Sequence, residues 1–349
     1  MKLSTAILRS VWASFALAAA CGAHAFGQAA STVTQDGVET GQANIRALVN
    51  VPAGFDPVKA SPEQLERLGF PRKPEAKQGP LAYKRWVDAV SAKRVFAEVK
   101  ENRDVTHGTM KRPSGFTGEE LNLDGKKVAN VNSSNWSGYA LVGGSPEFDA
   151  IEGYWVVPSV DYQFGGDGGY SSEWVGIDGY GSSDVVQAGT EQDSIGGYTN
   201  YHAWFEFYPF DYEQAISTST FPVAPGDAVY VYVSATHSGS YIVGRFYLYN
   251  ANTHLSVSYT DTRPNWYFQG NSAEWIMERP TVGGYLYDMP NFAYAYMDNG
   301  WAFRLGSGSY ISFLSEPYQN ITMVNGSDTL STAYSQDSIS MWFAWHAYH

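Results

Sequence analysis

Two carboxyls and one amide in this chain could act together in catalysis. Glu274 and Glu278 are four residues apart in a strand-like stretch, so they share one strand face while Trp275 and Met277 share the other. Gln187 lies in a second strand-like stretch and points away from its apolar side. A solvated sheet surface would account for each residue taken alone. Because two carboxyls among large apolar residues are costly to bury, the pattern also indicates a cleft.

The familiar catalytic motifs are absent from the sequence. It contains no Gly-x-Ser-x-Gly, no His-Glu-x-x-His, and neither Asp-Thr-Gly nor Asp-Ser-Gly. Its one cysteine, Cys21, lies in the N-terminal targeting segment, so the exported product has no cysteine nucleophile. Two more acids, Asp178 and Glu206, lie in segments rich in tryptophan and other apolar residues. The scattered histidines are interpreted as structural or surface residues: His202, His237, His254, His346 and His349.

The N-terminus has the features of a signal peptide. Lys2 and Arg9 provide the positive flank, and the apolar run over residues 11–20 is too short to span a bilayer. Ala23-His-Ala25 has the small-x-small form that precedes signal peptidase cleavage. We therefore predict that residues 1–25 are removed and that the product is secreted into the extracellular space.

Charge divides the rest of the chain into two parts. Residues 26–127 hold 16 Lys and Arg against 13 Asp and Glu, whereas residues 128–349 hold four Arg, no Lys and 22 Asp and Glu. Such a contrast indicates a domain boundary. The acidic part is unsuited to binding nucleic acid or an anionic membrane. We expect a basic, partly helical segment over residues 26–130 and an acidic domain over residues 131–349.

The expected secondary structure changes at the same boundary. Ser61, Pro62 and Gln64 form a helix-start signal, and apolar residues at helical spacing predict a second helix from Pro80 to about Asn102. From Val131 onward, twelve short strand-like segments alternate with Gly, Asn, Asp and Ser turns. This pattern is typical of a β-sandwich or a barrel.

The acidic domain resembles the glutamic peptidases of the eqolisin family, which are pepstatin-insensitive acid endopeptidases. The resemblance covers residues 132–349 and rests on six motifs in the order of the family. Two features depart from the fungal members: the domain has no cysteine, and Glu191 stands where an aspartate is familiar. The motifs are Asn135-Trp-Ser-Gly138, Gly153-Tyr-Trp-Val-Val-Pro158, Trp174-Val-Gly-Ile-Asp-Gly179, Gln187-Ala-Gly189, Ala203-Trp-Phe-Glu-Phe-Tyr-Pro209 and Ala273-Glu-Trp-Ile-Met-Glu278.

The resemblance implies an all-β fold of two packed antiparallel sheets, a concanavalin-like sandwich. It also implies a catalytic Gln–Glu dyad. The glutamine of the family falls on Gln187 and its glutamate on Glu278, with Glu274 as the alternative if the register is shifted by four residues. Trp174 is expected to line the substrate cleft. The acids expected beside the dyad are Asp178, Glu191 and Glu206.

This chemistry follows from the residue types. Peptide hydrolysis needs a base that activates water, a donor that stabilises the oxyanion and an acid for the leaving amine. A glutamate can be the base and then the acid, and a glutamine amide can be the donor. A carboxylate base, with a reference pKa of roughly 4, suits acid conditions. No metal or other cofactor is required, and we expect a monomer that acts on polypeptides.

Two other functions remain open from the residues alone. A glycoside hydrolase could use Glu274 and Glu278, but four residues along a strand span about 13 Å. Productive carboxyl pairs are roughly 5–9.5 Å apart. A non-catalytic carbohydrate-binding sandwich could use the many aromatic side chains, but it would leave the basic segment without a purpose.

The basic segment is interpreted as a propeptide. We expect it to dock on the acidic domain and to block the cleft as an intramolecular inhibitor. Its Lys and Arg would stabilise partner carboxylates near neutral pH, and this stabilisation would be lost in acid. Residues 103–127 read as a linker, and we expect self-cleavage between about Lys111 and Val131.

Overall fold

A computed structural model describes residues 37–110, 128–162, 168–265, 268–315 and 317–349. The predicted signal peptide and most of the predicted cleavage region lie outside these residues. The described part of the basic segment, from residue 37, and the acidic domain belong to one compact unit. No helix within the described ranges is long and apolar enough to cross a bilayer.

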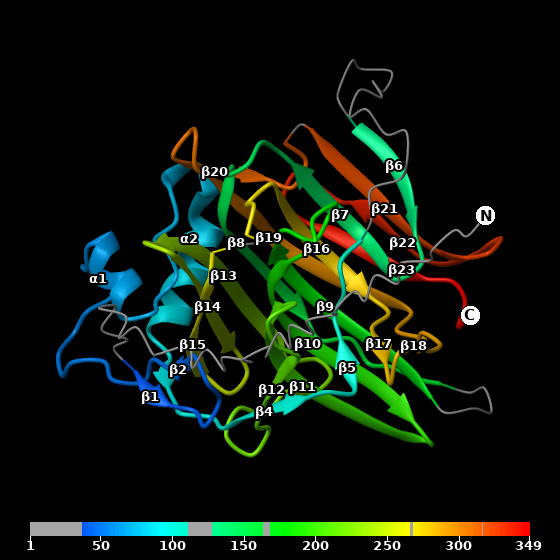
Figure 1. Ribbon diagram of the computed structural model, residues 1–349, viewed down its shortest axis with the longest axis horizontal. Coiled ribbons are helices and arrows are strands. Elements are labelled where there is room, and N and C mark those ends of the chain that lie inside the picture. Colours follow the sequence, from blue (N-terminus) through cyan, green and yellow to red (C-terminus); the bar gives the residue numbers. More distant parts are fainter. Residues whose placement is uncertain (1–36, 111–127, 163–167, 266–267, 316) are drawn as a thin grey trace, which may run out of the picture. The chain divides into compact units, whose positions relative to one another are not determined.

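The acidic domain is built from two antiparallel sheets (Figure 1). In the first sheet, β9 lies between β10 and β16, and these three central strands carry most of the predicted site residues. Glu206 lies on the neighbouring strand β11, and Asp178 directly follows β9. Strand β6 (Val128–Ser133) adds a parallel pairing at β21. The order of the first sheet is β12 (Glu213–Ile216), β11 (Tyr198–Tyr208), β10 (Val185–Ile195), β9 (Gly169–Ile177), β16 (Ser272–Glu278), β7 (Trp136–Val142) and β21 (Tyr318–Asn325).

The second sheet packs against the first. Its last strand, β22, also pairs with β21, so the two sheets are continuous at that edge. The short strand β20 (Ser309–Ser312) pairs with β19. The order is β15 (Leu255–Pro264), β14 (Tyr241–Asn250), β13 (Ala228–Ser238), β8 (Phe148–Val156), β19 (Tyr294–Arg304), β23 (Met341–Trp345) and β22 (Asp328–Ser335).

Strand alternation separates a core face from a site face on the first sheet. Val186 and Ala188 of β10 belong to the core cluster between the sheets, together with Trp155 and Val231 of the second sheet. Gln187 therefore faces the other way, as its position in the sequence predicts. The all-β sandwich is confirmed.

The helices of the basic segment cover the outer face of the second sheet. They are α1 (Pro62–Arg67), the 3₁₀ turn η1 (Ala76–Gln78) and α2 (Gly79–Val90). Leu65 and Trp86 are buried in a cluster with Tyr230 and Tyr247 of that sheet. The predicted start of α1 is confirmed, because the Ser61 and Gln64 side chains form a reciprocal capping box.

The predicted second helix is too long. It ends at Val90 rather than near Asn102, because the chain then joins the sheet. Strand β3 (Lys93–Arg94) runs beside β15, and the Val95 N–H donates to the Ser256 carbonyl. Two short strands near the start of the basic segment extend the same edge, β1 (Val38–Glu39) and β2 (Ile45–Ala47).

The end of the basic segment then crosses to the first sheet. Strand β4 (Val99–Asn102) pairs with β12, and β5 (Val105–Thr106) pairs with β17 (Thr281–Val282), which in turn pairs with β18 (Tyr285–Leu286). Met110 hydrogen bonds with Gly179 and Gly181 through its main chain. Two of these contacts, those of β5 and Met110, lie in the region predicted to be a linker, which is therefore ordered there.

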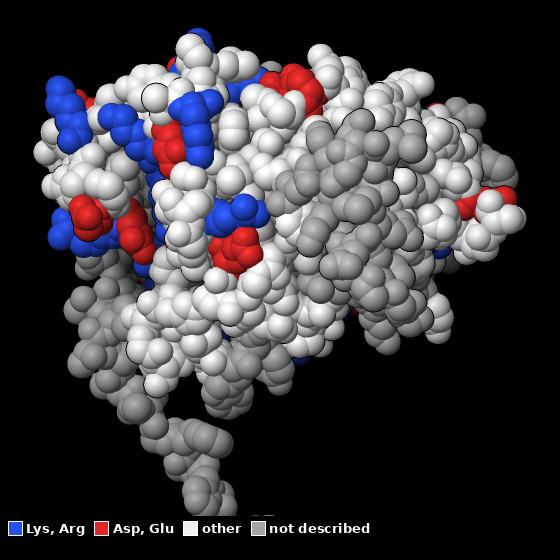
Figure 2. All heavy atoms as spheres, turned by 90° about the horizontal axis from the view of Figure 1, so that it is seen from above, with Lys and Arg blue, Asp and Glu red and all other residues white. Residues whose placement is uncertain are grey.

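Exposed charge follows the same division. Figure 2 shows most of the Lys and Arg side chains on the side where Figure 1 places α1 and α2. Few acidic side chains are visible elsewhere in this view. Many acids of the domain are instead buried, among them Glu152, Glu173, Glu191 and Glu206. Many of the acidic side chains that make the domain acidic therefore lie in its interior and not on its surface.

Glu152 marks one contact between the basic segment and the domain. Its carboxyl accepts hydrogen bonds from Gln78 of the segment at 3.0 Å, from the Tyr230 hydroxyl at 2.6 Å and from Asn299 at 3.1 Å. Burial nevertheless raises the pKa of Glu152 to about 7. Two ion pairs lie nearby, Arg72–Asp149 and Arg85–Asp298.

We predict that Glu152→Gln stabilises the protein at pH 8.5 but not at pH 5.5. The pKa of Glu152 is higher in the folded protein than in the unfolded chain. The contribution of this carboxyl to stability is therefore fully present at pH values below its unfolded pKa, and it is lost as pH rises through about 7. The pKa shift of Glu152 corresponds to about 3 kcal/mol in the free energy of unfolding. Urea unfolding of the wild type and the variant at both pH values measures it. An equal difference at both pH values would contradict the prediction.

Candidate active site

Gln187 is completely buried on the site face of the first sheet. It lies opposite Glu206 on β11 and Gly176 on β9. A Cβ atom on Gly176 would come within 3.1 Å of the Gln187 Cβ, so glycine leaves room for this side chain. The Gln187 amide Nε2 donates to the His107 carbonyl at 2.7 Å and to Glu206 Oε2 at 3.2 Å.

Glu278 lies at the end of β16 and is also completely buried. Its Oε2 accepts a hydrogen bond from the Trp174 indole at 2.8 Å. Its Oε1 accepts from the Trp136 indole at 3.3 Å and from Asn135 Nδ2 at 3.4 Å. These donors hold the carboxyl in one orientation on the site face.

The other predicted glutamate of β16 makes a different contact. Glu274 Oε1 accepts a hydrogen bond from the Tyr180 N–H at 3.2 Å. Glu278 and Gln187, in contrast, both contact one residue of the basic segment, His107. This shared contact favours Glu278 over Glu274 as the partner of Gln187.

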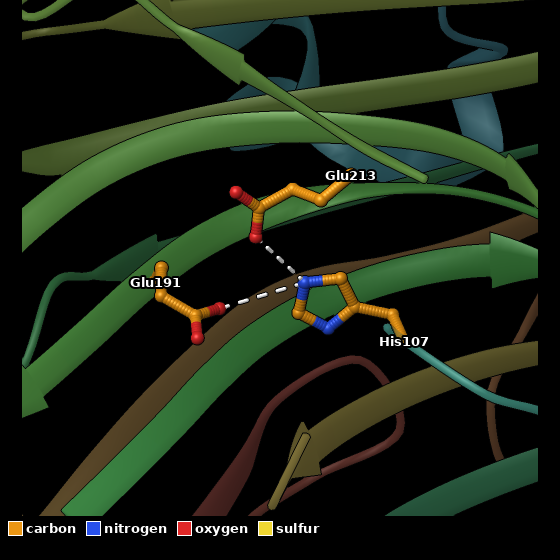
Figure 3. Close-up of side chains that lie close together, drawn as sticks. All are labelled: His107, Glu191 and Glu213. Atoms are coloured by element: carbon orange, nitrogen blue, oxygen red, sulfur yellow. Dashed lines mark hydrogen bonds and ion pairs between the residues drawn. The ribbon is translucent and has the colours of Figure 1, made fainter. Parts of the chain in front are cut away.

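His107 is the main feature that the sequence reasoning missed. Its imidazole Nδ1 lies 3.1 Å from Glu278 Oε2, and its Nε2 lies 3.1 Å from Glu213 Oε2 and 3.6 Å from Glu191 Oε2. Figure 3 shows the ring directed at Glu191 and Glu213. The ring stacks on Trp204 with centroids 3.6 Å apart. His107 therefore fills the site with a side chain of the basic segment.

The surrounding carboxyls keep this ring charged. Burial by itself would lower the pKa of His107, but hydrogen bonds with Glu213 and Glu278 and the charge of Glu191 raise it well above its usual value. Both ring nitrogens then carry protons, so each can donate to a carboxylate.

The carboxyls around His107 differ in their own titration. Burial raises the pKa of Glu206 and of Glu191, and the charge of Asp193 adds to the rise at Glu191. Burial also acts on Glu213, but the positive charge of His202 and the hydrogen bonds from both histidines lower the pKa of that carboxyl. Glu213 thus stays ionised at a lower pH than Glu191 and Glu206.

The Asp178 side chain binds backbone N–H groups and not Gln187 or Glu278. Its carboxylate accepts three backbone N–H groups, from Gln269, Gly270 and Asn271, each at 2.8 Å. These residues directly precede β16. The acid expected beside the dyad therefore fixes the turn that leads into the strand carrying Glu278.

Residues 134–342 match the model of the Peptidase A4 family. The chain belongs to this family. Aspergillopepsin-2 from Aspergillus niger is 30% identical over 253 residues, which cover 65% of this chain and 83% of that protein. The chain is a glutamic endopeptidase of the eqolisin family, as its motifs indicate. This membership decides against the glycoside hydrolase and carbohydrate-binding alternatives.

One solved structure shows the same fold. A structure of Scytalido-glutamic peptidase with a peptide based transition state analog is 23% identical, with a TM-score of 0.51, and covers 61% of this chain and 99% of that chain. Aspergilloglutamic peptidase from Aspergillus niger is 25% identical, with a TM-score of 0.43, and covers 51% of this chain and 99% of that chain.

One group in this eqolisin has the ligand types of a metal site. Donor atoms of His107, Glu191 and Glu213 lie within 4.8 Å of one another. The His107–Glu213 distance of 3.1 Å is already that of a direct hydrogen bond. A metal would need the deprotonated ring, whereas the carboxyls around it favour the protonated one. We therefore interpret the group as an ion-paired cluster.

The remaining site residues have only weak signals in the sequence. Trp204 and Trp136 lie inside motifs of the eqolisins, but their roles as the platform for His107 and the donor to Glu278 are visible only in three dimensions. Glu213 lies on a short strand that was not predicted. His202, interpreted from sequence as structural or exposed, is buried and bonds Glu213 at 3.0 Å.

Proposed function

We propose that the domain hydrolyses peptide bonds in acid with Gln187 and Glu278 as its catalytic dyad. The observation that carries the proposal is the position of His107. Its peptide carbonyl accepts the Gln187 amide at 2.7 Å while its ring contacts Glu278. A peptide carbonyl is therefore held at the glutamine that would stabilise the oxyanion, next to the glutamate that would activate water.

In this mechanism Glu278 first acts as a base. It takes a proton from water, and the resulting hydroxide attacks the carbonyl carbon of the substrate. The negative charge that develops on the carbonyl oxygen is stabilised by Nε2 of Gln187. Protonated Glu278 then donates its proton to the nitrogen of the leaving amine, and the peptide bond breaks.

The neighbouring residues support both roles. Trp174 and Trp136 donate to Glu278 and orient its carboxyl. Glu206 accepts from the Gln187 amide at 3.2 Å, which fixes the N–H₂ end of that side chain toward the cleft. A donor that is already oriented needs little reorganisation when charge develops. No metal takes part in this route.

We also propose that the chain is made as a secreted precursor. Residues 1–25 are the signal peptide, residues 26–130 the propeptide and residues 131–349 the catalytic domain. The propeptide would act as an intramolecular inhibitor, since His107 occupies the dyad. The mature enzyme would be a monomer that cleaves polypeptides outside the cell.

Acid would release the propeptide. A carboxyl whose pKa is lowered in the folded protein stabilises the docked state at pH values above its pKa in the unfolded chain. This stability is lost as pH falls through the folded pKa. Glu213, which pairs with His107, is such a group, but its pKa is held so low that it stays ionised at the acidic pH at which the enzyme works. It is therefore not the group whose protonation releases the propeptide. Ion pairs between the propeptide and the domain, Arg72–Asp149 and Arg85–Asp298, also hold the docked state, and acid weakens pairs of this kind.

We predict that Gln187→Ala and Glu278→Gln each abolish peptidase activity at acidic pH while the protein stays folded. Loss of an oxyanion donor alone costs about 100- to 1000-fold. Hydrolysis of an unfolded protein at pH 3–4, with pepstatin and a chelator present, measures activity, and near-UV circular dichroism reports folding. Glu274→Gln is the matched control on the same strand. A folded and fully active Glu278→Gln enzyme would refute the dyad.

We predict that the wild-type precursor matures faster in acid than at neutral pH. His107→Ala removes the ring that pairs with Glu213 and Glu278, so this variant should mature at higher pH than the wild type. Lys100→Ala, an exposed cation of the same segment, is the control. Gel analysis across a pH series follows conversion. Equal conversion rates at pH 4 and pH 7 would contradict acid release.

A further inference from the structure

We propose that the pocket around the His107 ring is the substrate pocket for the residue on the amino side of the scissile bond, and that it selects a cationic side chain, histidine above all. The inference rests on the proposed dyad and names the substrate class of the same site. In the precursor, the propeptide would occupy the pocket with a side chain of the preferred kind.

The main chain of His107 is placed as a substrate residue would be. Its carbonyl accepts the Gln187 amide, and its N–H donates to Glu206 Oε2 at 3.3 Å. The chain on either side is held in extended form, by β5 against β17 and by Met110 against Gly179 and Gly181. Strand-like main-chain pairing is a common way for a protein to bind a peptide. The carbonyl that faces the dyad thus belongs to His107, and Gly108 follows it.

The side chain lies in a pocket with a flat floor and an acidic end. The Trp204 ring is stacked beneath the imidazole, with an angle of 5° between the planes. Glu213 lies at the far end, in contact with Nε2, and Glu191 lies beside it. Trp204 and both glutamates are completely buried in the precursor. A planar cation satisfies both features, because it stacks on the indole and donates to the carboxylate.

The charge at the end of this pocket persists in acid. His202 Nε2 bonds Glu213 Oε1 at 3.0 Å, and His202 belongs to the catalytic domain, so this contact remains after the propeptide leaves. Asn102 of the propeptide donates to the same oxygen at 3.1 Å and is lost. The positive charge of His202 holds the pKa of Glu213 low, whereas burial and Asp193 raise that of Glu191. Glu213 therefore provides the negative charge at working pH.

Neutral side chains would fit this pocket poorly. Leucine or phenylalanine would cover Glu213 without donating to it and would leave a buried carboxylate with fewer partners. Sites built around a buried polar contact reject analogues that lack it more strongly than apolar pockets reject a change of size. Protonated histidine reaches Glu213 from the position seen here, and lysine presents the same charge on a flexible stem.

The test uses enzyme matured from the full-length precursor and four peptides built on Val105-Thr-X-Gly-Thr-Met110, with X as His, Lys, Phe or Leu. Mass spectrometry locates the cleaved bond, and initial rates at pH 4 give kcat/KM. We expect cleavage between X and Gly, with kcat/KM for His at least roughly tenfold above that for Phe. The kcat/KM for the Lys peptide should also exceed the values for the Phe and Leu peptides.

A substitution of Glu213 tests whether this residue causes the preference for a cationic side chain. Glu213→Gln should lower the His-to-Phe ratio of kcat/KM toward one, whereas the exposed control Asp328→Asn should leave the ratio unchanged. If Glu213→Gln does not fold, the wild-type series alone decides. Equal kcat/KM for His and Phe in an enzyme that Glu278→Gln inactivates would overturn the pocket while the dyad stands. Activity that survives Glu278→Gln would overturn the dyad, and the pocket proposal with it.

Discussion

The His107 ring lies between Glu213 and Glu278 with none of its surface exposed to solvent. A buried charge is stable only when it is paired, so the imidazolium and the carboxyls depend on one another. One of these carboxyls, Glu278, belongs to the proposed catalytic dyad. In the proposed precursor, occupation of the site and inhibition of the enzyme would therefore be one event, and the rest of the basic segment would hold His107 there.

The scaffold around this cluster follows from strand alternation. β9, β10 and β16 direct one set of side chains into the sandwich core and the other set into the site. The core supplies the rigidity that a buried polar cluster needs, and the indoles of Trp136 and Trp174 donate to Glu278 from neighbouring strands. The basic segment contacts both sheets: its helices pack on the outer face of the second sheet, and β4 pairs with β12 at the edge of the first.

Local patterns predict the elements better than the site. The capping box of Ser61 and the outward direction of Gln187 follow from spacing alone, and both are present in the structure. The end of α2 at Val90 depends on pairing with β15, which is distant in sequence. His107 lies in a polar stretch with no periodicity, and its role comes from carboxyls about 100 or more residues away. Contacts between residues so far apart produce no local pattern in a single sequence.

The ionisation state of His107 in the intact precursor tests the central claim most directly. Selective ¹³C or ¹⁵N labelling of histidine, with the His107 resonance assigned by comparison with His107→Ala, allows its titration to be followed by NMR. We predict that the ring is still fully protonated at pH 7.5, where a free imidazole with a pKa of roughly 6.5 is mostly neutral. Titration of His107 near pH 6.5 would show that the ring is not held among the carboxylates, and would contradict the account.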